Sequence, residues 1–505
     1  MNIASALAEP RWRLLLVVFA TLVFFVLANL RSPLPNDDGV LYLMLAGRSA
    51  EQGLTAAFEL VHRPLYALAI GGIHSLTGLG MSSAAQVLNG ACAIGLVLAF
   101  LRLARELHGE QSLWPWALLL LLFHPKLNNY FAYVMRDLGY WAALLGAFAL
   151  WLEHVERGSW RTLAAWAVLT LCAAAFKPEA LFFGVLLPLS LLHSAPARRP
   201  AAALLLPLLL VGFLAGAGPE ALATPVRELP AFPSGLFNEL PAAFSAAAAR
   251  HAEAVLATQA GELAAWSLAG GLLTVLVFTL LNTLGPAQVL LLAVAARKED
   301  LLPRPALRPA WALMLLGGVV LAGLSLAYRQ YLDTRIVMVP VLLALASTAR
   351  ALQQLVARSR AGGTGRHAVV LAGVATAVLL DLGLGLDRPK PHLLACVDWL
   401  RQELPEQSRI FTNDRQIAAG SGARWDWEEV EDAAGRIAAG TAPVDPAVLW
   451  VMRMRPGQTG LAKALSARSQ VLAPVTQFTG EGGDRIVVLR PLGRAEPVPP
   501  EPGAG

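Results

Sequence analysis

The chain has 505 residues, of which 56% are hydrophobic and 15% are charged, and its formal net charge is +5. Soluble domains carry about 25% charged residues, and the charges here cluster between long apolar windows, so the composition excludes an ordinary soluble enzyme. It predicts a polytopic helical membrane protein. The excess of arginine falls in short loops, where it indicates membrane topology rather than a nucleic-acid surface.

The first predicted element is an apolar helix over 13–30. At about 1.5 Å per residue it is long enough to cross a hydrocarbon core of about 30 Å. Two acids, Asp37 and Asp38, lie just beyond it. The apolar residues 40–46 are too few to span, so we expect one or two membrane-surface helices before the second span. An acid can cap a helix beginning near Gly39, but one cap accounts for one acid and not for two.

Further apolar windows bring the prediction to about eleven membrane spans. After the first, they lie near 84–103, 113–124, 138–154, 161–176, 180–193, 201–218, 270–296, 310–327, 331–349 and 367–386. The loops rich in arginine and lysine alternate consistently along this series. By the positive-inside rule they are cytoplasmic, which predicts a cytoplasmic N terminus and places the acid pair and the C terminus outside. The long polar segment 219–263 is then an outer loop.

The composition changes sharply near residue 388. An amphipathic helix pattern covers 393–404, and short strand patterns cover 409–412, 448–451 and 485–489. We therefore expect a transmembrane catalytic domain over 1–387, followed by a small α/β domain over 388–493 on the outer face. The segment 494–505 is rich in proline and glutamate, which predicts a disordered tail.

Standard catalytic and metal-binding motifs are missing from the sequence. Its three cysteines allow neither a disulfide framework nor a Cys-x-x-Cys metal site. No P-loop, Gly-x-Ser-x-Gly or His-Glu-x-x-His pattern occurs. These absences argue against an ATP-driven protein and against the common classes of hydrolase.

Several polar side chains fall on the predicted outer face beside the acid pair. The cations among them include Arg63, Arg136, Lys177, Arg329 and Arg335. Cations at one membrane depth can hold a lipid phosphate, and a carboxylate there can take a proton from an incoming hydroxyl or amine. Each of these residues also has a structural interpretation. Arg63 can anchor its helix by snorkelling to the membrane surface, Arg136 can form an ion pair with Asp137, and Lys177-Pro178-Glu179 can be a simple polar turn between two apolar segments.

At these residues the chain resembles the GT-C superfamily of integral-membrane glycosyltransferases, which includes protein O-mannosyltransferases and bacterial lipid A aminoarabinose transferases. The resemblance covers roughly residues 10–350 and the layout of an outer C-terminal domain. It rests on the acid pair after the first span, and on Tyr42, Ala46 and Gly53 in the following helix. It also rests on three short motifs: His62-Arg63-Pro64-Leu65-Tyr66, Lys177-Pro178-Glu179 and Arg329-Gln330-Tyr331.

The resemblance implies transfer of a hexose or pentose, with inversion, from a polyprenyl-phosphate-linked donor to an acceptor outside the inner (plasma) membrane. The acceptor can be a lipid, a glycan or a protein. The catalytic acid falls on Asp38 or Asp37, with Asp38 favoured by its spacing to Tyr42. Asp37 is a possible ligand for a divalent metal such as Mg or Mn, although some members need none. Phosphate contacts fall on Lys177, Arg329, Arg335 and Arg136, and pocket residues on Tyr42, His62, Arg63, Glu179 and Tyr331.

Two other functions remain open at this point. The first is a lipid or solute transporter or flippase, in which Asp37 and Asp38 would be ion-coupling groups. Transporters place such groups near the bilayer midplane and often show internal repeats, whereas these acids fall at the boundary. The second is a non-catalytic membrane scaffold.

Overall fold

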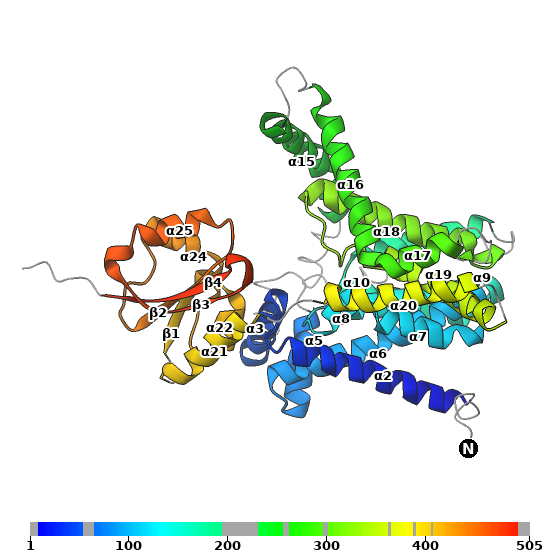
Figure 1. The fold of residues 1–505 in the computed structure, drawn as a ribbon, viewed down its shortest axis with the longest axis horizontal. Helices are drawn as coiled ribbons and strands as arrows, with labels where there is room; N and C mark the ends of the chain where they lie inside the picture. Colours follow the sequence, from blue (N-terminus) through cyan, green and yellow to red (C-terminus); the bar gives the residue numbers. More distant parts are fainter. Residues whose placement is uncertain are drawn as a thin grey trace, which may run out of the picture. The chain divides into compact units, whose positions relative to one another are not determined.

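The computed structural model describes residues 9–53, 65–193, 231–255, 262–295, 301–361, 365–386, 390–405 and 408–492 (Figure 1). The chain divides into two compact units. The first comprises Met1–Leu30 and Tyr42–Leu386, and the second comprises Arg31–Leu41 and Asp387–Gly505. The short segment Arg31–Leu41, which includes both candidate acids, therefore belongs with the C-terminal part of the chain.

Helices build the first unit. Its elements are α2 (Pro10–Arg31), α5 (Leu65–Thr77), α6 (Met81–His108), η1 (Gln111–Leu113), α7 (Trp114–Leu122), α8 (Pro125–Phe131), α9 (Asp137–Arg157), α10 (Trp160–Phe176), α11 (Glu179–Leu186), η2 (Leu187–His193), α15 (Ala231–Val255), α16 (Ala264–Leu284), α17 (Pro286–Ala295), η6 (Pro305–Leu307), α18 (Arg308–Arg329), α19 (Met338–Arg360) and α20 (Gly365–Gly385). Helix α3 (Asp37–Gln52) begins in the second unit and continues into the first.

Six helices among the described residues are long and apolar enough to cross a membrane. They are Pro10–Arg31, Met81–His108, Asp137–Arg157, Ala264–Leu284, Pro305–Arg329 and Met338–Arg360. Five shorter apolar helices accompany them: Leu65–Thr77, Gln111–Leu122, Trp160–Phe176, Glu179–Leu191 and Ala368–Gly383. The chain is thus a multi-pass membrane protein by the length and composition of its helices.

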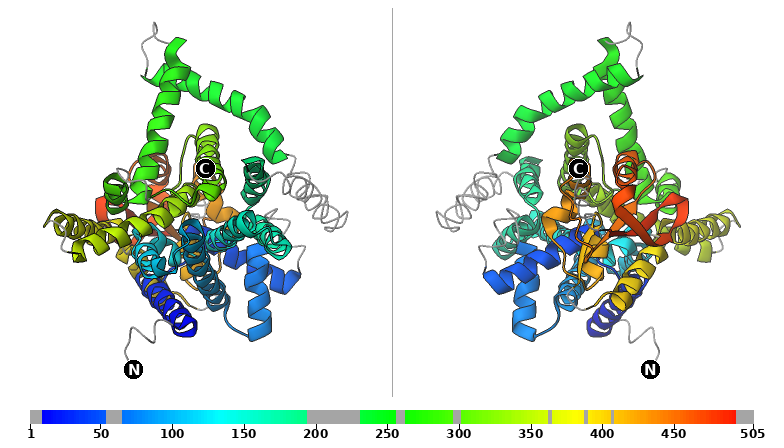
Figure 2. Two further views of the ribbon diagram at one scale, coloured as in Figure 1. Left: turned by 90° about the vertical axis from the view of Figure 1, so that its right-hand side faces the viewer. Right: turned by 90° about the vertical axis from the view of Figure 1, so that its left-hand side faces the viewer.

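Helices α9 and α19 are central in the first unit. Helix α9 packs along α6 and α10, while α19 contacts α6, α7, α17, α18 and α20. Trp141 and Trp151 of α9 and Trp166 of α10 are fully buried. Helix α16 is peripheral, and with α15 it forms an arm that extends away from the other helices in both views of Figure 2.

Four expected segments differ from the structure. The span expected over 331–349 begins only at Met338, because Gln330 adopts a left-handed backbone (φ 54°) that ends α18 and a turn follows. The span expected over 270–296 is broken at Gly285 (φ 88°) into α16 and α17. Residues 180–193 form a short α-helix and a 3₁₀ helix, η2. The polar loop 219–263 contains helix α15, and the span expected over 201–218 lies outside the described residues.

The second unit is an α/β domain. Its elements are α21 (Pro391–Glu403), β1 (Arg409–Thr412), α22 (Arg415–Gly420), α23 (Trp427–Glu431), α24 (Ala433–Ala439), β2 (Val448–Met454), α25 (Thr459–Ser466), η7 (Ser469–Val471), β3 (Leu472–Thr479), η8 (Glu481–Gly483) and β4 (Arg485–Pro491). The strand order is β1-β2-β4-β3, with β1 and β2 parallel and the other two pairs antiparallel.

Successive residues of β1 and β2 point to opposite faces of the sheet, as the period of two requires. Ile410, Leu449 and Val451 join a core with α21 and α22, whereas Phe411 and Trp450 join a second core with α24 and α25. The domain therefore has helices on both faces of its sheet, which Figure 1 shows. The predicted amphipathic helix and the three predicted strands are confirmed: β1 has the predicted bounds, β2 and β4 continue further, and α21 begins and ends slightly earlier.

Candidate functional site

The acid pair lies at the start of α3. The helix begins at Asp37, two residues earlier than expected, so both Asp37 and Asp38 occupy its first turn. Carboxylates are stabilised there by the partial positive charge of the helix N terminus. Asp37 is exposed and Asp38 is half-buried. Tyr42 follows Asp38 by four residues, which is one turn of the same helix.

The segment before α3 is anchored on the C-terminal domain. Leu34 packs against the apolar core between α21, α22 and the sheet. The side-chain amide of Gln416 donates a 2.7 Å hydrogen bond to the carbonyl of Pro35. These two contacts hold the backbone immediately before the acids, so the second unit fixes the start of α3 within itself.

Arg415 supplies the positive charge beside the acid pair. Its guanidinium donates two hydrogen bonds of 2.6 Å to the carboxylate of Glu431 and lies 4.7 Å from the ring centroid of Trp427. The hydrogen bond to Glu431 raises the pKa of Arg415, and the charges of Asp37 and Asp38 add to this effect. Arg415 is therefore a permanent, rigidly held cation in the field of both carboxylates.

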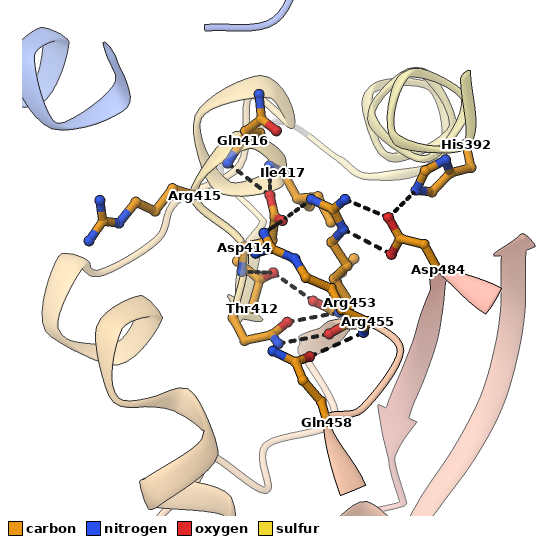
Figure 3. A network of polar contacts seen from close by, with 12 residues as sticks. His392, Thr412, Asp414, Arg415, Gln416, Ile417, Arg453, Arg455, Gln458 and Asp484 are labelled. Carbon is orange, nitrogen blue, oxygen red and sulfur yellow. Dashed lines mark hydrogen bonds and ion pairs between the residues drawn. The ribbon is translucent and has the colours of Figure 1, made fainter. Parts of the chain in front are cut away.

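A buried ionic network lies next to Arg415 (Figure 3). Arg453 donates to Asp414 at 2.8 Å and to both oxygens of Asp484 at 3.0 and 2.5 Å. The Asp484 carboxylate also contacts His392 at 3.1 Å. Burial opposes the charge of Arg453, but the hydrogen bonds to the two carboxylates outweigh it and raise its pKa. Asp414 also caps α22 by accepting from the backbone N–H groups of Gln416 and Ile417.

The surroundings of Asp37 do not fit a divalent metal. Asp37, Asp414 and Glu431 line one cavity, but Asp414 is bonded to Arg453 and Glu431 to Arg415. Across the ranges that the structure describes, no three His, Cys, Asp or Glu side chains gather as a metal site. The possible metal role of Asp37 therefore finds no free partner ligands in this cavity.

In the first unit, Lys177 forms a buried ion pair with Asp137. The side chains of Lys177 and Asp137 are 15% and 2% exposed, and the ammonium lies 5.7 Å from the ring centroid of Tyr140. A side chain at Gly139 would collide with the ring of Phe176. The glycine thus lets the end of α10 approach α9 closely enough to bring Lys177 to Asp137.

The other predicted cations lie at the ends of α9 and α18 and in the turn before α19. Arg136 immediately precedes α9 and is half-buried, and its side chain forms no hydrogen bond or ion pair within the described part of the chain. Arg335 pairs with Asp333 at 3.0 Å. The neighbouring Thr334 hydroxyl bonds the hydroxyl of Tyr130 at 2.5 Å, which ties this turn to α8. Arg329 is exposed in the last turn of α18.

The predicted pocket residues have different surroundings. The Tyr42 ring packs edge-on against the Tyr66 ring, with the two ring centroids 4.9 Å apart. The Tyr66 hydroxyl donates a hydrogen bond of 2.5 Å to the side-chain oxygen of Asn89. One carboxylate oxygen of Glu179 is buried without a hydrogen-bond partner among the described residues. Tyr331 is 65% exposed. His62 and Arg63 lie outside the described residues.

The sequence reasoning missed the residues of the second unit that lie beside Asp37. Asn413-Asp414-Arg415 directly follows β1, and polar residues after a strand of an α/β sheet are a known signal for a ligand site. That signal was present, but nothing in the sequence indicated that Asp37, nearly 380 positions earlier, would lie beside it.

No family model and no curated protein sequence matches the chain. Among solved structures, ArnT from Cupriavidus metallidurans bound to undecaprenyl phosphate is 14% identical, with a TM-score of 0.42, covering 95% of this chain and 98% of that one. The archaeal oligosaccharyltransferase AglB from Archaeoglobus fulgidus, in complex with an inhibitory peptide and a dolichol-phosphate, is 10% identical with a TM-score of 0.50. The match covers 97% of this chain and 75% of the AglB chain. At this identity the likeness to AglB concerns the fold alone.

Proposed function

We propose that the chain is a membrane glycosyltransferase that moves a sugar from a polyprenyl-phosphate-linked donor to an acceptor outside the plasma membrane. The observation that carries the proposal is the position of Asp37 and Asp38. They occupy the first turn of α3, shortly after the apolar helix α2 and beside the fixed cation Arg415. The likeness in fold to AglB, whose structure contains a dolichol-phosphate, supports the same class of donor.

Asp38 is the proposed general base. Its carboxylate takes the proton of an acceptor hydroxyl or amine while the freed electron pair attacks the anomeric carbon of the donor. The bond between that carbon and the phosphate oxygen breaks, and its electrons leave with the polyprenyl phosphate. Attack from the face opposite the phosphate inverts the anomeric centre.

The leaving phosphate needs positive charge as the bond breaks, because charge that develops there is stabilised by preorganised cations. We assign this role to Lys177, Arg136 and Arg335, with Arg329 as a further contact. Arg136 has no ionic partner among the described residues. Lys177 retains donors beyond the Asp137 carboxylate that it contacts, and Arg335 keeps its positive charge beside Asp333.

Topology is part of the proposal. An N terminus in the cytoplasm and a C-terminal domain outside the inner membrane would place α3 on the face where nucleotide sugars are absent. A lipid-carried donor then supplies the sugar.

Two experiments test the function. Mass spectrometry of envelope lipids, glycans and proteins from a deletion strain should reveal one acceptor that lacks a hexose or pentose. The purified chain in nanodiscs should then release free polyprenyl phosphate from a polyprenyl-phosphate-linked sugar when that acceptor is added. An unchanged envelope together with no donor turnover would contradict the proposal.

A further inference from the structure

A polar cavity opens at the carboxyl end of the parallel strands β1 and β2. Its volume is about 210 Å³, and it is lined by Asp37, Asn413, Asp414, Arg415, Val430, Glu431, Arg453, Arg455 and Gln458. Ligands of α/β sheets bind outside the carboxyl ends of parallel strands. The cavity lies wholly within the second unit.

Part of this lining is already committed to internal bonds. The side-chain amide of Asn413 both donates to and accepts from the backbone of Arg453, at 2.9 and 2.8 Å. Arg453 is bonded to Asp414, and Arg415 to Glu431. The Arg453–Asp414 pair makes a rigid wall, because moving either group would leave a buried charge without its partner.

Three other lining groups are available to a ligand. The Asp37 carboxylate has no hydrogen bond or ion pair within the ranges that the structure describes. Arg455 is 48% exposed, and its guanidinium makes one long contact of 3.5 Å, to Asp414. Gln458 accepts from the backbone of Arg455 through its side-chain oxygen, and its amide donors have no partner among the described residues.

The chemistry of these groups selects a class of ligand. The lining carries three carboxylates and three guanidinium groups, so its charge is balanced and a phosphate would find no surplus of cations. Hydroxyl groups both donate and accept hydrogen bonds, which matches an adjacent free carboxylate, guanidinium and amide. The volume is below the roughly 300–1,000 Å³ of sites for drug-sized ligands, and a single sugar ring is a ligand of suitable size.

We propose that this cavity binds one sugar residue of the acceptor, which is therefore a glycan or glycolipid. The acceptor role rests on the proposed function, whereas binding of a sugar does not. Asp37 lines the cavity and Asp38 is its neighbour in the chain. The Asp37 carboxylate can therefore bind a hydroxyl group of the sugar, and the proposed base, Asp38, is the next residue in the chain.

Binding is tested with the full-length protein in nanodiscs. Saturation-transfer NMR with a panel of methyl glycosides of hexoses, N-acetylhexosamines and pentoses should identify at least one that binds. Arg455→Ala and Gln458→Ala should each weaken that glycoside about tenfold or more. Arg490→Ala is the matched control, because Arg490 is an exposed arginine of β4 outside the cavity, and it should leave the affinity unchanged.

Three results would overturn the inference: no glycoside binds, the two cavity variants bind like the control, or inorganic phosphate displaces a bound glycoside. Asp38→Asn separates this inference from the proposed function. It should bind the glycoside normally while losing transfer. Normal transfer in Asp38→Asn would refute the proposed mechanism and leave the sugar site intact.

Discussion

At the scale of single residues, Lys177 shows how a side chain can have a structural role and a proposed functional one. The sequence placed it in a basic-Pro-Glu turn, and the structure pairs it with the buried Asp137. Replacing Lys177 by methionine leaves the Asp137 carboxylate buried without a cation. Removing one partner of a buried pair costs about 3–5 kcal/mol, so we expect a lower unfolding temperature and weaker binding of the lipid phosphate.

The double variant Lys177→Met with Asp137→Asn separates the two roles. It removes both charges, so most of the stability should return in thermal unfolding measurements. If Lys177 also binds the phosphate, polyprenyl phosphate should still bind about ten- to a hundredfold more weakly than to the wild type. Recovery of normal binding in the double variant would remove Lys177 from the donor site.

Residue-level prediction succeeded where the chemistry was local. Adjacent carboxylates after an apolar span indicated a special position, and both acids do fall in the first turn of a helix. The neighbouring cation Arg415 could not be predicted, because its approach to Asp37 depends on packing between segments far apart in the chain. The pairing of Lys177 with Asp137 likewise depends on how α9 meets α10.

At the scale of elements, hydrophobic patterns predicted α21 and three of the four strands of the C-terminal domain, and missed β3 and the short helices α22–α25. That strand is at the edge of the sheet and contains Pro474, with a register shift between Pro474 and Thr476. Proline is tolerated on edge strands because no ladder hydrogen bond is required there. Its alternation of buried and exposed residues is accordingly weak. The break at Gly285 inside the apolar window 270–296 was not predicted, because the apolarity of a segment does not indicate where its backbone changes direction.

The ionic network that joins β2 to the start of β4 gives a prediction about acid. The hydrogen bonds from Arg453 lower the pKa of Asp484, with burial opposing them and His392 adding to them. The stability contributed by this carboxylate is therefore complete above its unfolded pKa of about 3.9. It is lost as the pH falls through the lower folded value.

Asp484→Asn should destabilise the domain by about 1.5–3 kcal/mol at neutral pH, because a hydrogen bond to a charged group is lost. It should also reduce the additional loss of stability that the wild type shows below about pH 4. Thermal unfolding measured from pH 7 to pH 3 checks both effects. Asp398→Asn, which alters an exposed acid of α21, serves as the control. Equal acid sensitivity in both variants would contradict the assignment.

At the scale of the whole molecule, composition predicted a multi-pass membrane protein, and local helix and strand patterns predicted its small α/β domain. The membrane orientation came from the distribution of arginine, and it is a separate prediction. Ala50 is exposed on α3, and Arg161 is exposed near the start of α10. In a variant without native cysteines, Ala50→Cys should react with an impermeant maleimide in intact cells, whereas Arg161→Cys should react only after permeabilisation. The reverse pattern would invert the topology and remove the lipid-donor argument.

The central claim is that Asp38 is the base in sugar transfer from a lipid phosphate. The most direct measurement is single-turnover release of sugar from a polyprenyl-phosphate donor, in the presence of acceptor, by Asp38→Asn and Asp37→Asn proteins. Asparagine keeps the size of the side chain and removes the base, and general-base losses are typically 10²–10⁴-fold in rate. We predict such a loss in Asp38→Asn with donor affinity unchanged, and a smaller loss in Asp37→Asn. Near-wild-type rates in both variants would contradict the account, because the acid pair would then serve only to begin α3.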